Sequence, residues 1–469
     1  MRWTLLLCLA LFLNFILVRG HDRQRLVEVA TVLSGGAIVL LAYPAVWARL
    51  FAGHAGKALM AFFALGILGT ATAFSPRLAA FEVANLFLLY VAGMTTAEEL
   101  ARYGQRGLRL ILTCMAAACV LYACLFVVVY IGSLSLHIPL ELADFTVGFN
   151  NFRFFNHTQT STLPLLVLLC CLTPRTSKLR WLWLVLTTYW WMALYVTAGR
   201  GTMVGMAAGC VVAAAVARQG AGQYLRQMVL TAVLAIVAYY IFLVAIPPLF
   251  GIEGMHSFSD TLNRTAADPT SARTYLWHRA TSLIVQHPWL GVGPMHFAHH
   301  AGDIHLGGHP HDWLFQVGAE WGLPGLLCLL VALGLGLRAL VRTGWRVPAA
   351  DTDNKNIFAA LLVGAVAILV DGLVSGIFVM PQSQLGVALY LGCAFGWQRY
   401  VAPQETQAGP RRAIRVVIMT SVVAAMVAVV VAVWTDAPAR WRGDEMTPAQ
   451  QAANTGNLLS PRLWTAGFF

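Results

Sequence analysis

The chain has 469 residues, of which 59% are hydrophobic and only 11% are charged, and its mean hydropathy is +0.69. A soluble protein carries about 25% charged residues, so this composition excludes an ordinary soluble enzyme. The net charge of +11 indicates basic loops at an anionic membrane surface rather than a nucleic-acid partner.

Apolar runs long enough to cross a bilayer recur along the chain and lack the alternation of barrel strands. They predict an all-α, polytopic helical membrane protein with about 12–13 transmembrane helices. The predicted spans are 3–18, 26–45, 58–74, 81–94, 108–132, 162–174, 179–197, 202–217, 228–249, 323–340, 357–378, 383–398 and 415–434. We expect four regions, which are an N-terminal transmembrane bundle (1–249), a long loop (250–322), C-terminal transmembrane helices (323–434) and a polar, peripheral tail (435–469).

Arginines and lysines gather in alternate connections between the spans, and such connections are typically cytoplasmic. The residues concerned are Arg102, Arg106, Arg109, Arg175, Lys178, Arg180, Arg218, Arg226, Arg338, Arg342, Arg346, Lys355, Arg399, Arg411, Arg412 and Arg415. The stretch 135–161 and the loop 250–322 then face the outside. Arg19, Arg23 and Arg25 depart from this pattern, so it fixes the first hairpin least firmly.

The long loop contains the start signal of a helix, with Pro269 followed by Thr270 or Ser271 as the N-cap. Apolar residues then fall on one face of the predicted helix, namely Leu276, Ala280, Leu283 and Ile284, and Pro288 ends the stretch. The pattern predicts an amphipathic helix that lies on or against the membrane.

Nine of the 13 histidines lie between His256 and His311, yet their spacing matches no zinc motif. The nine cysteines lie in apolar spans without a CxxC pair, so we expect no metal site, no cofactor and no disulfide. The pair His309 and His311 is followed directly by Asp312. An acid beside a histidine can orient the ring and raise its basicity, as a general base requires.

Two arginines suit a diphosphate, since a guanidinium presents a planar fork of donors to phosphate oxygens. Arg200 lies between two glycines at the outer end of a span, where snorkelling to lipid headgroups is the alternative interpretation. Arg273 opens the loop helix. Glu320 fits helix capping or pairing with an arginine. Asp371 lies within an apolar span, where a carboxylate needs a partner or a cavity.

Four patches of the chain together resemble the O-antigen ligase and polymerase superfamily of bacterial envelope glycan enzymes. The first is rich in aromatic and amide residues, the second is Gly-Arg-Gly, and the fourth carries the His-Pro-His-Asp sequence. The patches are residues 149–160 running into 163–165; 199–201; 271–273 with 287–293; and 309–312 with 320–322. Where this family often has Asn after the second histidine, the chain has Asp312. The resemblance covers roughly residues 85–400.

This resemblance implies a GT-C-type, metal-independent glycosyltransferase with a long periplasmic loop in the bacterial inner membrane. The donor would be O-antigen on undecaprenyl diphosphate, and the acceptor would be the core oligosaccharide of lipid A, with membrane lipids as the surroundings. His311 would act as general base, while Arg200 and Arg273 would bind the leaving diphosphate, so that the anomeric centre is inverted. His309, Asp312, Glu320 and Asp371 complete the candidate site, and the donor cavity would be lined by Arg153, His157 and Gln159.

Three alternatives to ligation remain open from the sequence. The same superfamily contains O-antigen polymerases and protein O-oligosaccharyltransferases, which differ in their acceptor. Asp371 also raises a different class, a lipid-linked oligosaccharide transporter. A transporter should show polar residues near mid-membrane in several spans, whereas the polar residues of this chain gather at the predicted outer boundary. The similarity of residues 153–160 to the ligases favours ligation.

Overall fold

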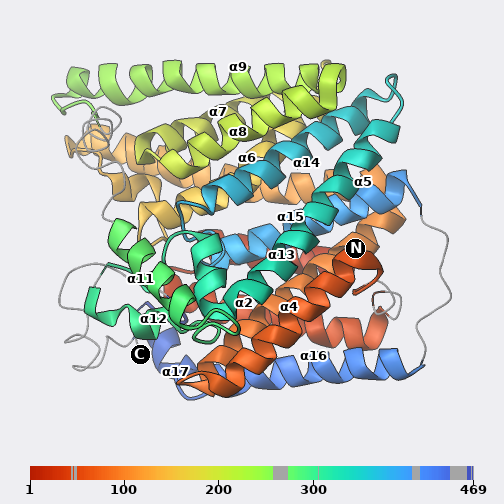
Figure 1. Ribbon diagram of the computed structural model, residues 1–469. Helices are drawn as coiled ribbons and strands as arrows, with labels where there is room; N and C mark the ends of the chain where they lie inside the picture. Colours follow the sequence, from red (N-terminus) through yellow and green to blue (C-terminus); the bar gives the residue numbers. More distant parts are fainter. Residues whose placement is uncertain are drawn as a thin grey trace.

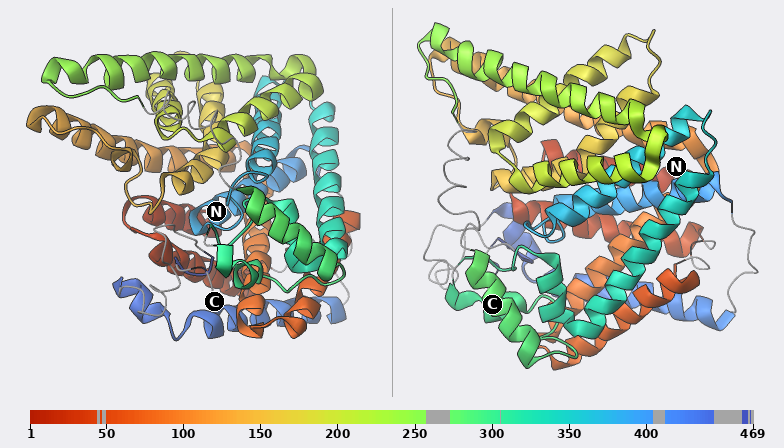
Figure 2. Two further views of the ribbon diagram at one scale, coloured as in Figure 1. Left: turned by 60° about the vertical axis from the view of Figure 1, so that its left-hand side comes forward. Right: turned by 45° about the horizontal axis from the view of Figure 1, so that its top comes forward.

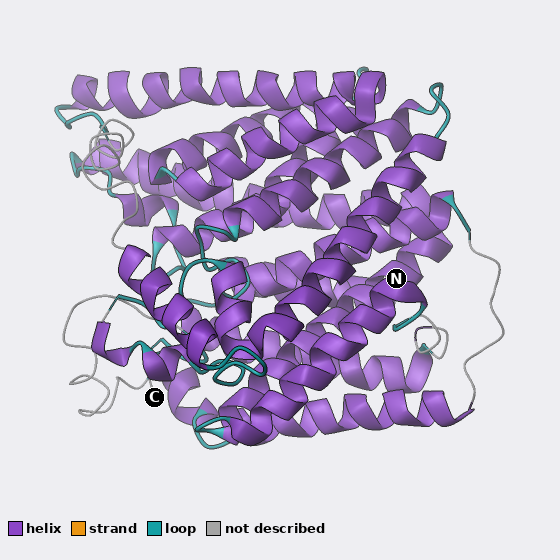
Figure 3. Ribbon diagram, viewed as in Figure 1, coloured by secondary structure: helices purple, strands orange, loops and turns teal. Residues whose placement is uncertain are grey.

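The computed structural model describes residues 1–43, 46, 50–256, 273–304, 306–403, 412–443, 462–465 and 467. Within these residues every regular element is a helix (Figures 1 and 3). The α-helices are α1 (Arg2–Ile16), α2 (His21–Ala42), α4 (Gly53–Thr72), α5 (Pro76–Leu136), α6 (Phe152–Leu172), α7 (Leu179–Thr197), α8 (Arg200–Ala217), α9 (Gly222–Tyr239), α11 (Arg273–Gln286), α12 (Phe297–His300), α13 (Trp313–Arg346), α14 (Thr352–Asp371), α15 (Pro381–Val401), α16 (Arg412–Val433) and α17 (Ala437–Arg442). Short 3-10 or π segments follow at Leu142–Phe145, Arg218–Ala221, Tyr240–Ala245, Pro247–Phe250 and Gly302–Ile304.

The predicted all-α, polytopic architecture is confirmed. Among the described residues, eight helices are long and apolar enough to cross a membrane, and every predicted span overlaps a helix of the structure. In the bundle α15 packs on α5, and α14 packs between α8 and α6. Helices α9 and α16 lie at opposite edges (Figures 1 and 2). All nine cysteines are free and lie on these long helices.

Two long helices bend sharply at a glycine in the left-handed region. Gly104 (φ 56°) divides α5 between the predicted spans 81–94 and 108–132. Gly322 (φ 72°) divides α13 into a short first part, residues 313–321, and the part that holds the predicted span 323–340. We call residues 313–321 the outer part of α13. A Cβ at Gly322 would lie 2.5 Å from the Trp289 carbonyl oxygen, so only glycine allows this close approach of the two backbones. The bend also frees the Leu323 N–H, which donates to the Pro288 carbonyl at 2.8 Å.

The predicted basic connections meet at one end of the bundle. Arg109 at the start of the second part of α5 pairs with Asp353 at the start of α14, at 2.9 Å. The Trp345 indole at the end of α13 donates to the Val216 carbonyl at the end of α8. Helices α11 and α12 lie at the other end of α13 (Figure 1). The histidine-rich segment is therefore separated from the basic connections by the length of the bundle.

The amphipathic helix of the long loop is confirmed as α11, and its proposed N-cap residues lie outside the described part of the chain. Its apolar face packs on the outer part of α13 and on the preceding turn, with Leu276, Ala280 and Leu283 buried against Phe297 and Ala319. We expected this face to meet the membrane. It packs on protein instead, because the bend at Gly322 presents a second apolar surface to it.

The polar tail differs from the expectation of a peripheral segment. Arg462, Leu463 and Trp464 are at most 7% exposed and lie within the bundle. The tail carries few apolar residues, and two of them, Leu463 and Trp464, are buried. Burial of Leu463 and Trp464 favours insertion of the segment through the hydrophobic effect. The neighbouring Arg462 is buried with them, and it pairs there with Glu320.

Candidate active site

The histidine pair lies in the loop between α12 and α13. His309 is only 2% exposed, and its Nδ1 accepts a hydrogen bond from the His311 backbone N–H at 3.2 Å. The two ring centroids are 4.1 Å apart. His311 is half-buried and adopts a left-handed backbone conformation (φ 54°). The Trp277 indole of α11 donates to the Pro310 carbonyl at 3.1 Å, so the loop helix holds this turn in place.

Both rings are tuned towards the neutral state. Burial lowers the pKa of His311 well below its usual value, and the positive charges of Arg273 and Arg153 lower it further. Burial likewise lowers the pKa of His309, with His311, Arg462, His157 and Arg273 adding to the effect. A neutral imidazole can accept a proton, so the environment suits a general base at neutral pH.

Asp312 lies directly before α13. Its Oδ1 accepts hydrogen bonds from the backbone N–H groups of Leu314 and Phe315, at 2.7 and 3.1 Å, and so caps α13. Burial raises the pKa of Asp312, although these two bonds oppose the rise. An aspartate directly before an apolar helix is a typical N-cap, and this signal was present in the sequence.

Asp371 lies at the end of α14 and has the buried partners that a carboxylate in an apolar span requires. Its Oδ2 accepts from the Thr160 hydroxyl of α6 at 2.6 Å and from the Thr202 hydroxyl of α8 at 3.4 Å. His157 Nδ1 lies 4.0 Å from the same oxygen. The carboxylate therefore ties α6, α8 and α14 together.

Gly201 is the point at which α8 meets this carboxylate. A Cβ on Gly201 would lie 2.3 Å from Asp371 Oδ1, which is far inside contact distance, and the hydroxyls of Thr160 and Thr202 hold the carboxylate where it is. The glycine after Arg200 is thus needed for packing.

We expect Gly201→Ala to destabilise the protein by about 1–3 kcal/mol, the usual cost of forcing a methyl group into a packed interior. Gly132→Ala is the matched control, because a Cβ there meets nothing within 4 Å. Thermal unfolding of both purified variants in detergent measures the effect. Equal melting temperatures for the two variants would show that Asp371 moves aside freely.

The three candidate arginines approach from different elements. Arg273, the first residue of α11, is half-buried and close enough to act electrostatically on both His311 and Asp371. Arg153, near the start of α6, is exposed, lies over the Phe152 ring at 5.8 Å and also acts on His311. Arg200 is half-buried at the start of α8. The structure joins it to this region through Gly201 and Asp371.

Gln159 is fully buried and links helices. Its Nε2 donates to the Trp190 carbonyl of α7 at 2.7 Å, and its Oε1 accepts from Asn156 Nδ2 at 2.9 Å. Asn156 also donates to the Thr197 hydroxyl at 2.6 Å. These bonds fix the start of α6 against the end of α7, so Gln159 supports the site from within the bundle.

Glu320 pairs with an arginine, one of the two roles that its sequence context fitted. The partner is Arg462 of the C-terminal segment, at 2.6 Å, and both side chains are at most 1% exposed. Glu320 Oε1 also accepts from the Phe297 backbone N–H at 3.1 Å. Sequence reasoning missed Arg462, although it stands beside the apolar pair Leu463 and Trp464 in an otherwise polar tail.

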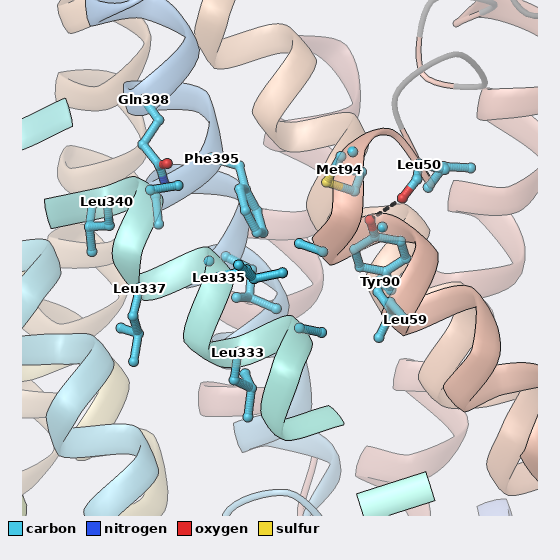
Figure 4. A pocket seen from close by; sticks show the side chains of 18 of the residues that line it. Leu50, Leu59, Tyr90, Met94, Leu333, Leu335, Leu337, Leu340, Phe395 and Gln398 are labelled. Atoms are coloured by element: carbon cyan, nitrogen blue, oxygen red, sulfur yellow. Dashed lines mark hydrogen bonds between the residues drawn. The ribbon is translucent and has the colours of Figure 1, made fainter. Parts of the chain in front are cut away.

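A cavity of about 1970 Å³ runs between α4, α5, α13 and α15. Figure 4 shows its apolar walls, with Leu333 and Leu337 on α13, Phe395 on α15 and Tyr90 on α5. The lining extends from Gln316 on the first turn of α13 to basic residues such as Arg342. We expected Arg153, His157 and Gln159 to line a donor cavity; the lining of this one comes from other helices.

Residues 182–330 match the family model described as O-antigen ligase. The match supports the resemblance of this chain to the O-antigen ligase superfamily. It includes Arg200, Arg273, the histidine pair, Asp312 and Glu320. A comparison with curated proteins finds no match.

The matched stretch contains most of the histidines. Two have clear structural contacts: His296 Nε2 accepts from the Ser75 N–H at 2.8 Å, and His299 stacks on Phe74. Within the described residues, which exclude His305, no three histidine, cysteine or acidic side chains are grouped as a metal site would need.

Proposed function

We propose that the chain is a membrane glycosyltransferase that ligates O-antigen from undecaprenyl diphosphate onto the lipid A core. The observation that carries the proposal is His311, a half-buried histidine whose pKa is lowered beside the cations Arg273 and Arg153, within the stretch that matches the O-antigen ligase model. A base and a diphosphate site are the two functions that this transfer demands.

The reaction follows as a single displacement. His311 takes the proton of the acceptor hydroxyl while the hydroxyl oxygen forms a bond to the anomeric carbon of the donor. The bond from that carbon to the diphosphate oxygen breaks, and undecaprenyl diphosphate leaves with the electron pair. Arg273 and Arg200 stabilise the charge that develops on the leaving group. Attack opposite the leaving group inverts the anomeric centre.

Two further features support a lipid-linked donor. The apolar walls of the cavity suit an isoprenoid chain, and its lining reaches the first turn of α13, next to the histidine loop. The basic connections lie at the other end of the bundle and mark the cytoplasmic side by the usual rule. The candidate site then faces the periplasm, in a multi-pass protein of the bacterial inner membrane.

The proposal predicts that purified protein transfers glycan from undecaprenyl-diphosphate-linked O-antigen to lipid A core in detergent, and that this activity survives EDTA. Product formation is followed by gel mobility and mass spectrometry.

Other products would identify other activities. Repeat units added to a second lipid-linked donor would identify a polymerase, and transfer to a serine- or threonine-containing peptide would identify a protein oligosaccharyltransferase. Lipid-linked glycan flux across liposomes without transfer would identify a transporter. Loss of activity in EDTA, restored by one divalent ion, would contradict the metal-independent mechanism.

A further inference from the structure

The C-terminal segment Arg462–Thr465 is anchored by the two residues Trp464 and Thr465. The Thr465 N–H and hydroxyl both donate to Asp22 Oδ1 at 2.6 Å. The Trp464 indole donates to Asp436 Oδ2 at 3.1 Å, and the Arg440 guanidinium lies 5.5 Å above the indole ring. The segment is therefore tied to α2 and to the residues around α17, and these ties aim Arg462 into the bundle.

Arg462 makes a forked set of contacts with α13. Its Nη2 donates to both oxygens of Glu320, at 2.7 and 2.6 Å. With the Gln316 amide in the orientation that satisfies both groups, Gln316 Oε1 accepts from Arg462 Nη1 at 2.6 Å. Gln316 and Glu320 are one turn apart on the outer part of α13. One guanidinium thus binds two residues of the outer part of α13, which begins directly after the histidine pair.

The same guanidinium balances buried negative charge. Glu28, Glu82 and Glu320 are each at most 6% exposed. Arg25 pairs with Glu28 at 2.5 Å, and Arg462 Nη2 lies 3.4 Å from Glu82 Oε1. The two arginines are themselves linked, since Arg25 Nη2 donates to the Arg462 carbonyl at 3.2 Å. Without Arg462, two of these carboxylates would lose their guanidinium partner in a medium that solvates charge poorly.

We propose that Arg462 is a positioning residue of the glycan-transfer site, supplied by the C-terminal segment to hold the outer part of α13 and thereby the His309–His311 turn. The proposal rests on the proposed function. It accounts for a feature that the ligase domain match leaves out, because Arg462 lies 132 residues beyond the end of that match at residue 330 (462 − 330).

The expected kinetic result separates positioning from simple stabilisation. Arg462→Ala should reduce transfer by about 10²-fold, since a displacement of about 1 Å at a catalytic group has that effect. In Arg462→Ala combined with Glu82→Gln and Glu320→Gln, both carboxylates that lost their partner are neutralised and the membrane level should recover. Transfer should stay low, because the fork that joins Gln316 to the segment is still missing. Arg19→Ala, at an exposed arginine, is the control and should behave as the wild type.

The pH profile gives a readout that a purely structural role would not move. The charged and titratable groups that act on His309 are His311, His157, Arg273 and Arg462, and Arg462 lowers its pKa. Once His309 is protonated, its Nδ1 cannot accept the hydrogen bond from the His311 N–H. Activity should therefore fall as the pH drops through the pKa of His309. Removal of the Arg462 cation raises that pKa and should move the acid limb towards higher pH. Arg462→Lys keeps the charge and should keep the limb at the wild-type position.

Docking of the segment is measured without any activity assay. A Leu463→Cys variant, in a background without native cysteines, should resist a membrane-impermeant thiol reagent because this side chain is buried. Adding Arg462→Ala should make it react. If the wild type transfers no glycan, the proposed function fails while the labelling still tests the docking. Equal labelling in both backgrounds, or wild-type transfer with an unmoved acid limb in Arg462→Ala, would overturn the role of Arg462.

Discussion

His311→Ala should lose transfer by about 10²–10⁴-fold, the usual effect of removing a general base. The variant should still fold and bind donor, because the ring acts on the acceptor hydroxyl and the neighbouring cation, Arg273, is unchanged. The measurement is glycan attachment to lipid A core in a ligase-deleted strain, with the amount of protein in the membrane checked by blot. His311→Asn should be equally inactive and better folded, since asparagine tolerates the left-handed backbone of this position (φ 54°).

Two other histidines make this test specific. His278→Ala, at an exposed position on α11, should leave attachment unchanged. His309→Ala should be milder than His311→Ala, because the His309 ring acts through the hydrogen bond that it accepts from His311. Near-normal attachment by His311→Ala at equal membrane level would remove this residue from the mechanism. A dead His309→Ala beside an active His311→Ala would exchange the two roles.

Arg273→Ala should reduce transfer by about 10²–10³-fold, the range seen when one preorganised donor to a developing negative charge is removed. Donor binding should weaken as well, because the guanidinium meets the diphosphate both before and during the reaction. Transfer rates measured against donor concentration in detergent separate these two effects. Arg200→Lys should also be strongly impaired, since lysine keeps the charge but loses the fork.

A second arginine on the same helix provides the control for Arg273. Arg279 pairs with the exposed Asp303 at 2.7 Å, and Arg279→Ala should keep normal rates and normal donor dependence. If Arg273→Ala and Arg279→Ala behaved alike, the effect would belong to α11 as a structural element. The diphosphate site would then have to be sought at Arg153 and Arg200.

Much of the fold follows from local sequence patterns. Hydropathy locates the spans because a lipid-embedded backbone must be helical, and the spacing of Leu276, Ala280 and Leu283 correctly predicts the buried face of α11. The surface that covers this face was beyond such reasoning. It depends on the bend at Gly322, and a glycine inside an apolar run carries no sign of its backbone angle.

The candidate site shows the same limit. The need for a partner at Asp371 follows from its apolar surroundings, but its partners Thr160 and Thr202 lie 211 and 169 residues away. Glu320 was expected to cap a helix or pair with an arginine, and nothing in its vicinity indicates Arg462, 142 residues further on. Asp312 stands next to His311 in the chain, and its carboxylate caps the helix that follows.

The acidic pocket around Arg462 has a consequence for how the protein is made. Synthesis proceeds from the N-terminus, so Glu28, Glu82 and Glu320 are inserted into the membrane before Arg462 leaves the ribosome. Glu28 can pair with Arg25 on its own helix. Until Arg462 arrives, Glu82 and Glu320 must keep water or protons, since bare charges are too costly in a lipid-embedded interior. The nascent bundle therefore stays hydrated at its outer end, and its last assembly step is the closure of that end by the C-terminal segment.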